Sequence, residues 1–376
     1  MSSLPAHADR PHVLLCNWRD LRNPEGGGSE RYVEQVARGL VRRGNDVTIF
    51  CAAHEHAPDD EVVDGVRYVR RGTKTGVYPH ALARLLLRRF GRVDVVVDVQ
   101  NGLPFFTRLV TRRPVVVLVH HVHREQWPVV YPGPIGRVGW WIESWLAPRL
   151  YRRSRYVAVS TATRDELVDL GVDADRIDIV HNGNDVADSD LPARSDSPRL
   201  CVVGRLVPHK RVEHAIDVVA ALAPQIDGLH LDVVGDGWWH DNLVAYAAER
   251  GVADRVTFHG FVDDRTKNEI YGQAWVMLLP SLKEGWGIVI GEAGTHATPT
   301  IAYASAGGTR ESIDHDVSGV LVDTEAELTE AARRLLTDTA ERGRLGKGAR
   351  EKCHAYTWEQ TTRDFATVVT KSLVKS

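Results

Sequence analysis

The chain has 376 residues, of which 43% are hydrophobic and 26% charged, and its formal net charge is −3. That length exceeds what one ordinary hydrophobic core serves, so it favours two domains. The composition is typical of soluble globular proteins, and no apolar run approaches the roughly 18 residues of a membrane-crossing helix. These numbers exclude fibrous, disordered and membrane-spanning proteins.

The positive charge is concentrated in the first half of the chain. Residues 1–182 contain 26 Lys and Arg against 21 Asp and Glu, a net charge of +5, which leaves −8 for the remainder. Within residues 67–155 there are 17 basic and 4 acidic residues. This bias indicates an anionic partner for the first half rather than a particular fold. Nucleic acid is not the expected partner, because no recognition motif accompanies the charge.

Cysteine usage and the N-terminal residues favour a cytoplasmic protein. Residues 1–10 contain no apolar segment of the kind found in secretory signals. The cysteines are scattered, without C-x-x-C spacing, and we expect them to be reduced and buried rather than paired or bound to metal. They are Cys16, Cys51, Cys201 and Cys353.

Apolar strand-like runs alternate with amphipathic helical runs from the N-terminus onward. The pattern predicts a strand at residues 12–16, a Gly-rich loop, a helix at about 29–43 and a strand at 46–51. The unbroken apolar run at 115–119 predicts a further buried strand.

Two basic segments of the first half admit two interpretations. Residues 84–92 combine three leucines with four arginines, and residues 137–155 combine five arginines with Trp140, Trp141 and Trp145. Helices with apolar and aromatic faces beside arginine often lie on anionic membranes. Alternatively, the aromatic side chains face the core and the arginines face water.

The second half repeats the alternation of strands and helices and ends in a helix at about 358–374. Alternating β and α elements predict two parallel, doubly wound sheets, whose ligands bind at the carboxyl ends of the strands. The strands are expected at residues 199–203, 230–234, 255–259 and 276–279, and the helices at 211–223, 241–250, 264–272 and from about 287 to 297.

A polar, Pro-punctuated stretch at residues 185–198 reads as a linker between two domains. We therefore expect an N-terminal domain at 1–184 and a C-terminal domain at 185–356.

The most informative local pattern is a pair of carboxylates eight positions apart, Glu284 and Glu292. The first is expected on the loop that follows the strand at 276–279, and the second about two turns into the next helix. A helix N-terminus at such a loop offers free N–H groups and a positive dipole end, which suits an anion.

This pattern resembles the E-x7-E signature of retaining, family 4-type glycosyltransferases of the GT-B fold. Other motifs follow in matching order: the Gly-rich residues 26–31, His120 after an apolar strand, the "NG-D" turn at 181–185, the GR…K element at 204–210, and Gly307-Gly308 with Glu311. The resemblance covers nearly the whole chain. It implies two Rossmann-like domains facing across a cleft, with the C-terminal helix (357–376) packed back on the first.

The resemblance also implies a binding site for a nucleoside-diphosphate sugar. Arg205 and Lys210 would bind the diphosphate, Glu284 the sugar hydroxyls and Glu292 the ribose. Asp263 is expected as a helix N-cap, and Asp264 as a contact of a guanine base, because the run to Lys267 resembles members that use GDP-mannose. Further donor contacts are expected from Gly27, Gly28, Gly204, Phe261, Val262, Gly287, Ile288 and Val289.

On the acceptor side, the resemblance implies that a histidine approaches the reacting sugar. His120 is the candidate, with His121 and His123 as alternatives or as acceptor contacts. Glu25 is expected to face an acceptor hydroxyl. A metal ion is not expected at the histidines, because no carboxylate or cysteine stands at ligand spacing and such family members need none.

We therefore expect a metal-independent, cofactor-free, retaining transferase. It would move a hexosyl group from a GDP- or UDP-sugar to a hydroxyl of a glycan, lipid-linked or small-molecule acceptor, in the cytoplasm or on the inner membrane face. One alternative is a nucleotide-sugar epimerase of the same fold, which would convert the donor without an acceptor. Another is a non-catalytic protein that binds nucleotide sugar or membrane.

Overall fold

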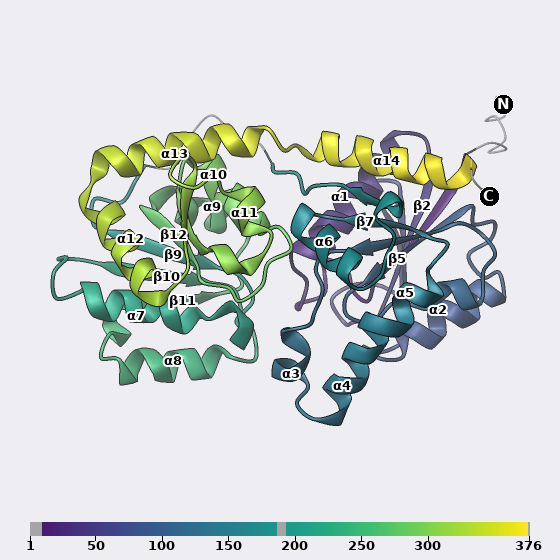
Figure 1. The fold of residues 1–376 in the computed structure, drawn as a ribbon, viewed down its shortest axis with the longest axis horizontal. Coiled ribbons are helices and arrows are strands. Elements are labelled where there is room, and N and C mark those ends of the chain that lie inside the picture. Colours follow the sequence, from purple (N-terminus) through teal and green to yellow (C-terminus); the bar gives the residue numbers. More distant parts are fainter. Residues whose placement is uncertain (1–9, 186–192, 375–376) are drawn as a thin grey trace.

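The structure, a computed structural model, describes residues 10–185 and 193–374, which form two α/β domains (Figure 1). Each domain is built around its own sheet, with helices on both faces. Half of the linker expected at 185–198, residues 186–192, lies outside the described residues.

The first sheet belongs to the N-terminal part of the chain. Its strands are β1 (His12–Cys16), β2 (Asp46–Cys51), β3 (Asp60–Val63), β4 (Val66–Arg70), β5 (Val95–Gln100), β6 (Val115–Val119), β7 (Arg155–Ala158) and β8 (Ile177–Ile179). They lie in the order β3-β4-β2-β1-β5-β6-β7-β8, parallel except for the antiparallel pair β3 and β4 at one edge. The central strands β1, β5 and β6 are rich in buried Val and Leu because helices cover both faces of the sheet.

Helices of the first domain cover this sheet and also form an excursion after β6. They are α1 (Gly28–Arg42), α2 (Val77–Leu86), η1 (Thr107–Leu109), α3 (Gln126–Val130), α4 (Pro134–Trp141), the π-helical η2 (Ile142–Leu146), α5 (Ala147–Leu150), α6 (Thr161–Asp169) and η3 (Ala174–Arg176). In Figure 1, α3 and α4 project below the first domain, on the side of the second.

The second sheet is wholly parallel. Its strands are β9 (Arg199–Val203), β10 (His230–Val234), β11 (Val256–Gly260), β12 (Val276–Leu279), β13 (Thr300–Tyr303) and β14 (Gly319–Val322). They lie in the order β11-β10-β9-β12-β13-β14, so the chain switches direction across the sheet between β9 and β12. That switch point is where doubly wound sheets bind their ligands.

Helices of the second domain follow the predicted alternation. They are η4 (Pro208–Lys210), α7 (Val212–Leu222), α8 (His240–Glu249), η5 (Ala253–Arg255), α9 (Asp264–Gln273), α10 (Ile288–Thr295), η6 (Ala304–Ala306), α11 (Thr309–Ser312), α12 (Glu325–Thr337) and α13 (Thr339–His354). The helix expected to reach residue 297 ends at Thr295, and Ala297 has a left-handed φ of 55°.

The last helix, α14 (Trp358–Val374), returns to the first domain and packs along α1 (Figure 1). Its buried side chains include Phe365 and Val368, which join the core formed by α1 and the first sheet. The second domain adds Trp286 to the same cluster. The two domains therefore share part of one hydrophobic core.

One of the two basic segments folds differently from the predicted helix, and the other is helical over most of its length. In the first, α2 ends at Leu86 and Arg88 has a left-handed φ of 53°, so residues 84–92 do not form one helix. In the second, α4, η2 and α5 follow one another without a gap from Pro134 to Leu150, so most of residues 137–155 are helical as predicted, and β7 begins at Arg155. The first segment contains Gly91, with a φ of 76°, and glycine disfavours the continuation of a helix.

Candidate active site

The two sheets present the carboxyl ends of their strands to each other. Gly285, after β12, lies so close to His120, after β6, that a Cβ on the glycine would stand 2.0 Å from the histidine carbonyl oxygen. Likewise, a Cβ on Gly28 would lie 3.1 Å from Cδ1 of Ile288. Most of the predicted site residues follow these strand ends.

Glu284 and Lys210 form an ion pair in the second domain. Lys210 lies at the end of η4, after β9, and its Nζ donates to Oε1 of Glu284 at 2.5 Å. Both side chains are largely buried, at 21% and 11% exposure. The backbone of Glu284 is fixed too, because its N–H donates to the carbonyl of Ala306. A lysine held this way presents a fixed cation at the switch point of the sheet.

The N-terminus of α10 points into the same region. Gly287 precedes the helix with φ 81° and ψ 68°, a left-handed conformation that glycine adopts without strain. No side chain caps α10. The first N–H groups of the helix, from Ile288 and Val289, therefore have no intrahelical partner and suit an anion.

Glu292, in the second turn of α10, is surrounded by donors. Lys267 Nζ lies 3.2 Å from Oε1, and the Tyr271 hydroxyl donates to Oε2 at 2.9 Å. Arg31, on α1 of the first domain, approaches Oε1 at 3.4 Å. The carboxylate is only 13% exposed, so these partners offset the cost of its burial. The contact between Arg31 and Glu292 was not predicted, because the two residues are far apart in the sequence.

Arg205 lies on the loop after β9, opposite the Gly-rich loop of the first domain. A Cβ on Gly27 would lie 3.9 Å from its Nε. Arg205 is exposed to solvent. Its pKa is nevertheless lowered, because the surrounding protein desolvates the guanidinium and the charge of Arg19 repels it. The carboxylates Glu30, Glu25 and Glu284 oppose this shift. The guanidinium therefore stands among carboxylates of both domains.

The Gly-rich loop is organised by Glu30. Its Oε2 accepts from the N–H of Gly27 at 2.8 Å, and its Oε1 accepts from Nε of Arg19 at 3.2 Å. Burial alone would raise the pKa of Glu30, but Arg19, Arg205, the Ser29 hydroxyl and the Gly27 amide together lower it. Glu30 is therefore an ionised anchor at the start of α1.

Glu25, the predicted acceptor contact, pairs within its own domain. Its Oε2 lies 3.2 Å from Arg19 and 3.3 Å from Lys74, and its side chain is 58% exposed. Desolvation raises the pKa of Glu25, but Lys74, Arg19 and Arg205 lower it overall. The negative charge beside the Gly-rich loop is thus neutralised by cations.

The loop predicted to contact a base follows β11. Asp263 caps α9, because its carboxylate accepts from the N–H of Thr266 at 2.8 Å, which confirms the N-cap prediction. Asp264 lies 3.0 Å from Lys267 and is 73% exposed. Phe261 is 79% exposed, whereas Val262 packs against the core. Phe261 and Asp264 are thus accessible beside the Glu292 cluster.

His120 is the predicted histidine at the end of β6, and it is 6% exposed. Its ring meets Tyr32 edge-on, with ring centroids 5.2 Å apart, and its Nε2 has no hydrogen-bond partner among the described residues. Burial lowers the pKa of His120 to about 4, and Glu30 opposes this shift. The imidazole is therefore neutral at physiological pH.

The rings of His121 and His123 lie in contact, with centroids 4.1 Å apart and planes tilted by 36°. Nε2 of His121 shares a hydrogen bond of 3.0 Å with Oε1 of Gln126. Nδ1 of His123 lies 3.0 Å from Oε1 of Glu143, a carboxylate 20 positions along the chain. The sequence interpretation considered only carboxylates at metal-ligand spacing from these histidines, and Glu143, 20 positions away, was not among the predicted site residues. The sequence does contain one feature that could have drawn attention to Glu143, because it is the only acidic residue in 137–155.

The described ranges, 10–185 and 193–374, bear on two further expectations, which concern metal ligation and the cysteines. Within these ranges, no three His, Cys, Asp or Glu side chains converge in a way that could hold a metal ion. The four cysteines are free and buried, which confirms the prediction that they are reduced core residues.

The surface around α3 and α4 carries exposed apolar side chains. Trp141 and Trp145 stack with ring centroids 5.2 Å apart and are 49% and 44% exposed, whereas Trp140 packs against the core. The set is Val129, Val130, Tyr131, Ile135, Val138, Trp141 and Trp145, named here the α3–α4 surface. None of the helices in the described part of the chain combines the length and apolar character that crossing a membrane requires.

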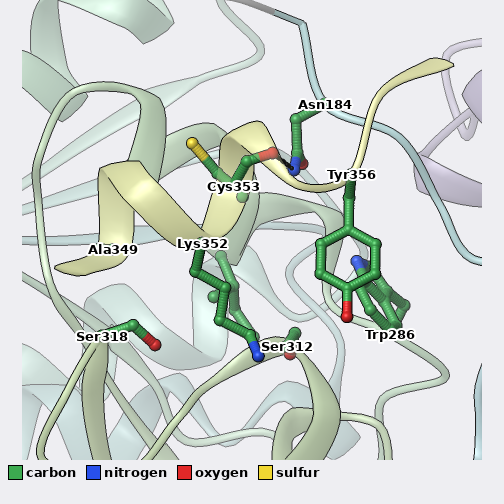
Figure 2. Close-up of a pocket in the computed structure, with 10 residues that line it drawn as sticks. Asn184, Trp286, Ser312, Ser318, Ala349, Lys352, Cys353 and Tyr356 are labelled. Carbon is green, nitrogen blue, oxygen red and sulfur yellow. Dashed lines mark hydrogen bonds between the residues drawn. The ribbon is translucent and has the colours of Figure 1, made fainter. Parts of the chain in front are cut away.

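A separate pocket lies where the two domains connect, behind α10 (Figure 2). Asn184 donates from its amide to the carbonyl of Cys353 at 2.9 Å beside it, and Trp286, Lys352 and Tyr356 contribute side chains. None of the predicted site residues lines this pocket. It belongs to the connection between the domains and not to the site.

Comparison with family models covers most of the chain. Residues 26–188 match a model described as "Glycosyltransferase Family 4", and residues 185–352 match one described as "Glycosyl transferases group 1". The two matches meet near the end of the first domain.

Two named relatives are similar over almost their whole length. The D-inositol 3-phosphate glycosyltransferase of Xylanimonas cellulosilytica is 30% identical, and the alignment covers 89% of each chain. The GDP-mannose-dependent alpha-(1-6)-phosphatidylinositol monomannoside mannosyltransferase of Mycobacterium tuberculosis is 27% identical, with 87% of this chain and 90% of that protein aligned.

Solved structures share the fold. Sucrose-phosphate synthase from Thermosynechococcus elongatus superposes with a TM-score of 0.82 at 20% identity, covering 98% of this chain and all of that one. Anabaena HepE, solved with UDP and glucose, superposes with a TM-score of 0.75 at 18% identity, covering 96% of this chain and all of that one.

Proposed function

Because this chain belongs to the family 4-type glycosyltransferases of the GT-B fold, we propose that it transfers a hexosyl group from a nucleoside-diphosphate sugar to a hydroxyl, with retention at the anomeric carbon. One observation carries this proposal: Lys210, Glu284, Glu292 and the free N-terminus of α10 converge at the switch point of the second sheet. Anion-binding and hydroxyl-binding groups at that spacing suit a diphosphate placed between a sugar and a ribose.

In the proposed mechanism the cations of the second domain act on the leaving group. Lys210, Arg205 and the α10 N–H groups bind the diphosphate and stabilise the charge that develops as the sugar–phosphate bond breaks. The acceptor oxygen forms its bond on the same face of the sugar, and its proton passes to the leaving phosphate oxygen. No protein nucleophile and no metal ion is then required.

Carboxylates fix the two ends of the donor in this proposal. Glu284 releases Lys210 to the phosphate and accepts from hydroxyls of the sugar. Glu292 accepts from the ribose hydroxyls, in place of its present contacts with Lys267 and Arg31. Arg31 belongs to the first domain, so this exchange links donor binding to the relative position of the two domains.

Two donor bases are compatible with the loop after β11. Asp264 is exposed and suits the N1 and N2 donors of guanine, and one relative is named for its use of GDP-mannose. HepE, a structural neighbour, was solved with UDP and glucose. We propose a GDP- or UDP-sugar as the donor.

The proposal is tested by thermal-shift measurements with GDP, UDP and ADP and their common sugar conjugates. Selective binding raises the midpoint of unfolding for one base series by mass action. The anomeric configuration of a product, read by proton NMR, then tests retention. If none of these nucleotides stabilises the protein, the donor site assigned to Lys210 and Glu292 is wrong.

Two other functions make opposite predictions in the same assays. A nucleotide-sugar epimerase converts the donor into a new nucleotide sugar with no acceptor present. A non-catalytic binding protein shows the thermal shift but no turnover with any acceptor. In the proposed mechanism Lys210 would lie beside the leaving phosphate, and this cation at the switch point supports catalysis over binding alone.

We also propose that the α3–α4 surface binds an anionic membrane, where a lipid-linked acceptor would be found. Ile135, Val138, Trp141 and Trp145 follow one another at intervals of three or four residues, so they form one apolar face. Arg149 stacks over Trp145 at 4.2 Å, and the one acidic residue of the segment is buried. Exposed cations beside apolar side chains suit acidic lipid headgroups. Residues 84–92 add Leu86 and Leu87, exposed beside arginines.

Vesicle co-sedimentation tests this surface. Binding to vesicles of phosphatidylglycerol and phosphatidylcholine should exceed binding to phosphatidylcholine alone, weaken with added salt, and fall at least tenfold in a Trp141→Ser, Trp145→Ser double variant. Val317→Ser, at a 57% exposed apolar position of the second domain, is the matched control. Equal binding by wild type and the double variant would contradict the assignment.

A further inference from the structure

Glu143 is a buried carboxylate that the proposed donor chemistry does not use. Its side chain has no exposed surface. Oε1 accepts from the backbone N–H of His123 at 3.2 Å and from Nδ1 of the same residue at 3.0 Å, and Oε2 accepts from Nε1 of Trp127 at 2.6 Å. Three N–H donors therefore converge on one carboxylate.

The position of Glu143 favours a functional role. An isolated buried carboxylate is costly, and an amide or an apolar side chain would hold two helices together at less cost. Glu143 lies in η2, a π-helical turn, and such turns occur frequently at functional sites. Among the described residues, no Lys or Arg forms an ion pair with Glu143, and His123 is the basic side chain that faces it.

The contact with Glu143 determines the chemistry of His123. An ionised carboxylate only accepts hydrogen bonds, so Nδ1 of His123 must carry a proton. In the neutral ring, Nε2 is then the acceptor. Nε2 of His123 has no hydrogen-bond partner among the described residues, and the side chain is 17% exposed. His123 thus keeps one basic nitrogen for a ligand.

His123 lies beside the proposed diphosphate site. It is close enough to His209, on η4 of the second domain, to help lower the pKa of that residue to about 3, after burial, Lys210 and Arg205. His209 directly precedes Lys210, and α3 packs against η4. A group bound at Nε2 would therefore stand near the phosphate that Lys210 binds.

We infer that Glu143 is a positioning residue that holds His123 in the Nδ1-protonated tautomer, so that Nε2 accepts a hydrogen bond from a hydroxyl of the acceptor. This inference rests on the proposed transferase function. The reacting hydroxyl gives its own proton to the leaving phosphate, so Nε2 binds a second hydroxyl. The acceptor is then a polyol with a hydroxyl next to the reacting one, such as a sugar or an inositol ring.

The tautomer is measured directly by ¹⁵N NMR of histidine-labelled protein at about pH 8, above the usual histidine pKa. Ring-nitrogen shifts separate a protonated from an unprotonated nitrogen, and His123→Asn identifies the His123 signals by their loss. Wild type should show Nδ1 protonated and Nε2 bare. In Glu143→Gln, one oxygen must serve Trp127 and His123 together, so the two tautomers should become mixed.

A second variant tests the use of Nε2. In His123→Asn, the amide nitrogen takes the place of Nδ1 and keeps the bond to Glu143, while Nε2 is lost. Two water molecules can replace a polyol, because one attacks and passes its proton to the leaving phosphate while the other takes the place of the neighbouring hydroxyl at Nε2. Slow hydrolysis of UDP-glucose or GDP-mannose should therefore fall about tenfold in kcat, with the KM for the donor unchanged. Glu143→Gln should lower the same kcat.

The control is Asp98→Asn, which removes an equally buried carboxylate of the same domain, bound to Tyr151 and Thr107. It should lower stability and leave the His123 tautomer unchanged. Two results would contradict the inference and leave Glu143 with a structural role alone. The first is Nε2 protonated in the wild type. The second is an unchanged tautomer and hydrolysis rate in Glu143→Gln. The NMR result needs no substrate, so failure of the donor assignment and failure of this inference are told apart.

Discussion

The two domains build their faces of the proposed site in opposite ways. The second domain takes its donor-side groups from the switch point of one parallel sheet, where Lys210 follows β9 and Glu284 follows β12. The first domain adds an excursion between β6 and β7, in which Glu143 reaches back 20 positions to His123. The donor side is local to strand ends, and the acceptor side is assembled across a folded segment.

This difference has a physical origin. A diphosphate needs fixed cations and free N–H groups, which any strand–loop–helix turn of a parallel sheet can supply. In the inferred acceptor site, the hydroxyl beside the reacting one is bound by a neutral ring nitrogen, and a buried partner sets the tautomer of that ring. Variants on the two sides should therefore fail differently, the first in turnover and donor affinity and the second in acceptor use.

The largest effect is expected from Lys210→Ala, on the donor side. Loss of the lysine that binds the phosphate should reduce kcat by roughly 10²–10³-fold with folding intact, because the lysine charge stabilises the leaving group in the transition state. Steady-state kinetics and circular dichroism provide the measurement. Lys347→Ala, at an 80% exposed lysine on α13, is the control. A near-wild-type rate would remove Lys210 from the site.

A smaller effect is expected from Glu292→Gln. The neutral amide weakens hydrogen bonds to the ribose, so nucleotide affinity should fall about ten- to a hundredfold, as expected for hydrogen bonds to a charged group. Isothermal titration with UDP or GDP, whichever stabilises the protein, measures the change. Glu249→Gln, at an exposed position on α8, should bind as wild type does. Unchanged affinity in Glu292→Gln would place the ribose elsewhere.

The smallest effect concerns stability on the acceptor side. Burial lowers the pKa of His120 to about 4 in the folded protein, against about 6.5 when unfolded. As pH falls from 6.5 to 4, the unfolded state gains a proton that the folded state excludes, so stability decreases through that window. Between pH 7 and pH 5 the free energy of unfolding should decrease by about 1–2 kcal/mol more in wild type than in His120→Phe.

Urea titrations at the two pH values measure this difference. His121 and His209 also have pKa values lowered by burial, but they contribute equally to both proteins. Equal pH dependence in wild type and variant would mean that the pKa of His120 is not lowered in the folded protein.

Much of the fold could be predicted from the sequence, because parallel strands covered on both faces are continuous apolar runs. The runs at 12–16 and 115–119 became β1 and β6 with the predicted bounds. The stretch at 84–92 could not be predicted, because Leu86 and Phe90 stand four positions apart, as in a helix, although the helix of the structure ends at Leu86. Its turn depends on Arg88 in a left-handed conformation.

The donor-side candidates could be named because each follows a predicted strand at short range. Glu143 and Arg31 were missed for the same physical reason: their partners, His123 and Glu292, are reached only through tertiary contacts. A lone acidic residue in a basic, aromatic segment is the one trace that Glu143 leaves in the sequence.

The sequence by itself determined the alternation of strands and helices, the two parallel sheets and the membership of a transferase family, because hydrophobic period and motif order are local properties. Only the tertiary structure decided which charges meet. It brought Arg31 of one domain to Glu292 of the other, buried Glu143 against His123, and turned Trp141 and Trp145 outward while Trp140 packed inward. Such pairings depend on how helices and domains pack, and packing joins residues that no sequence spacing relates.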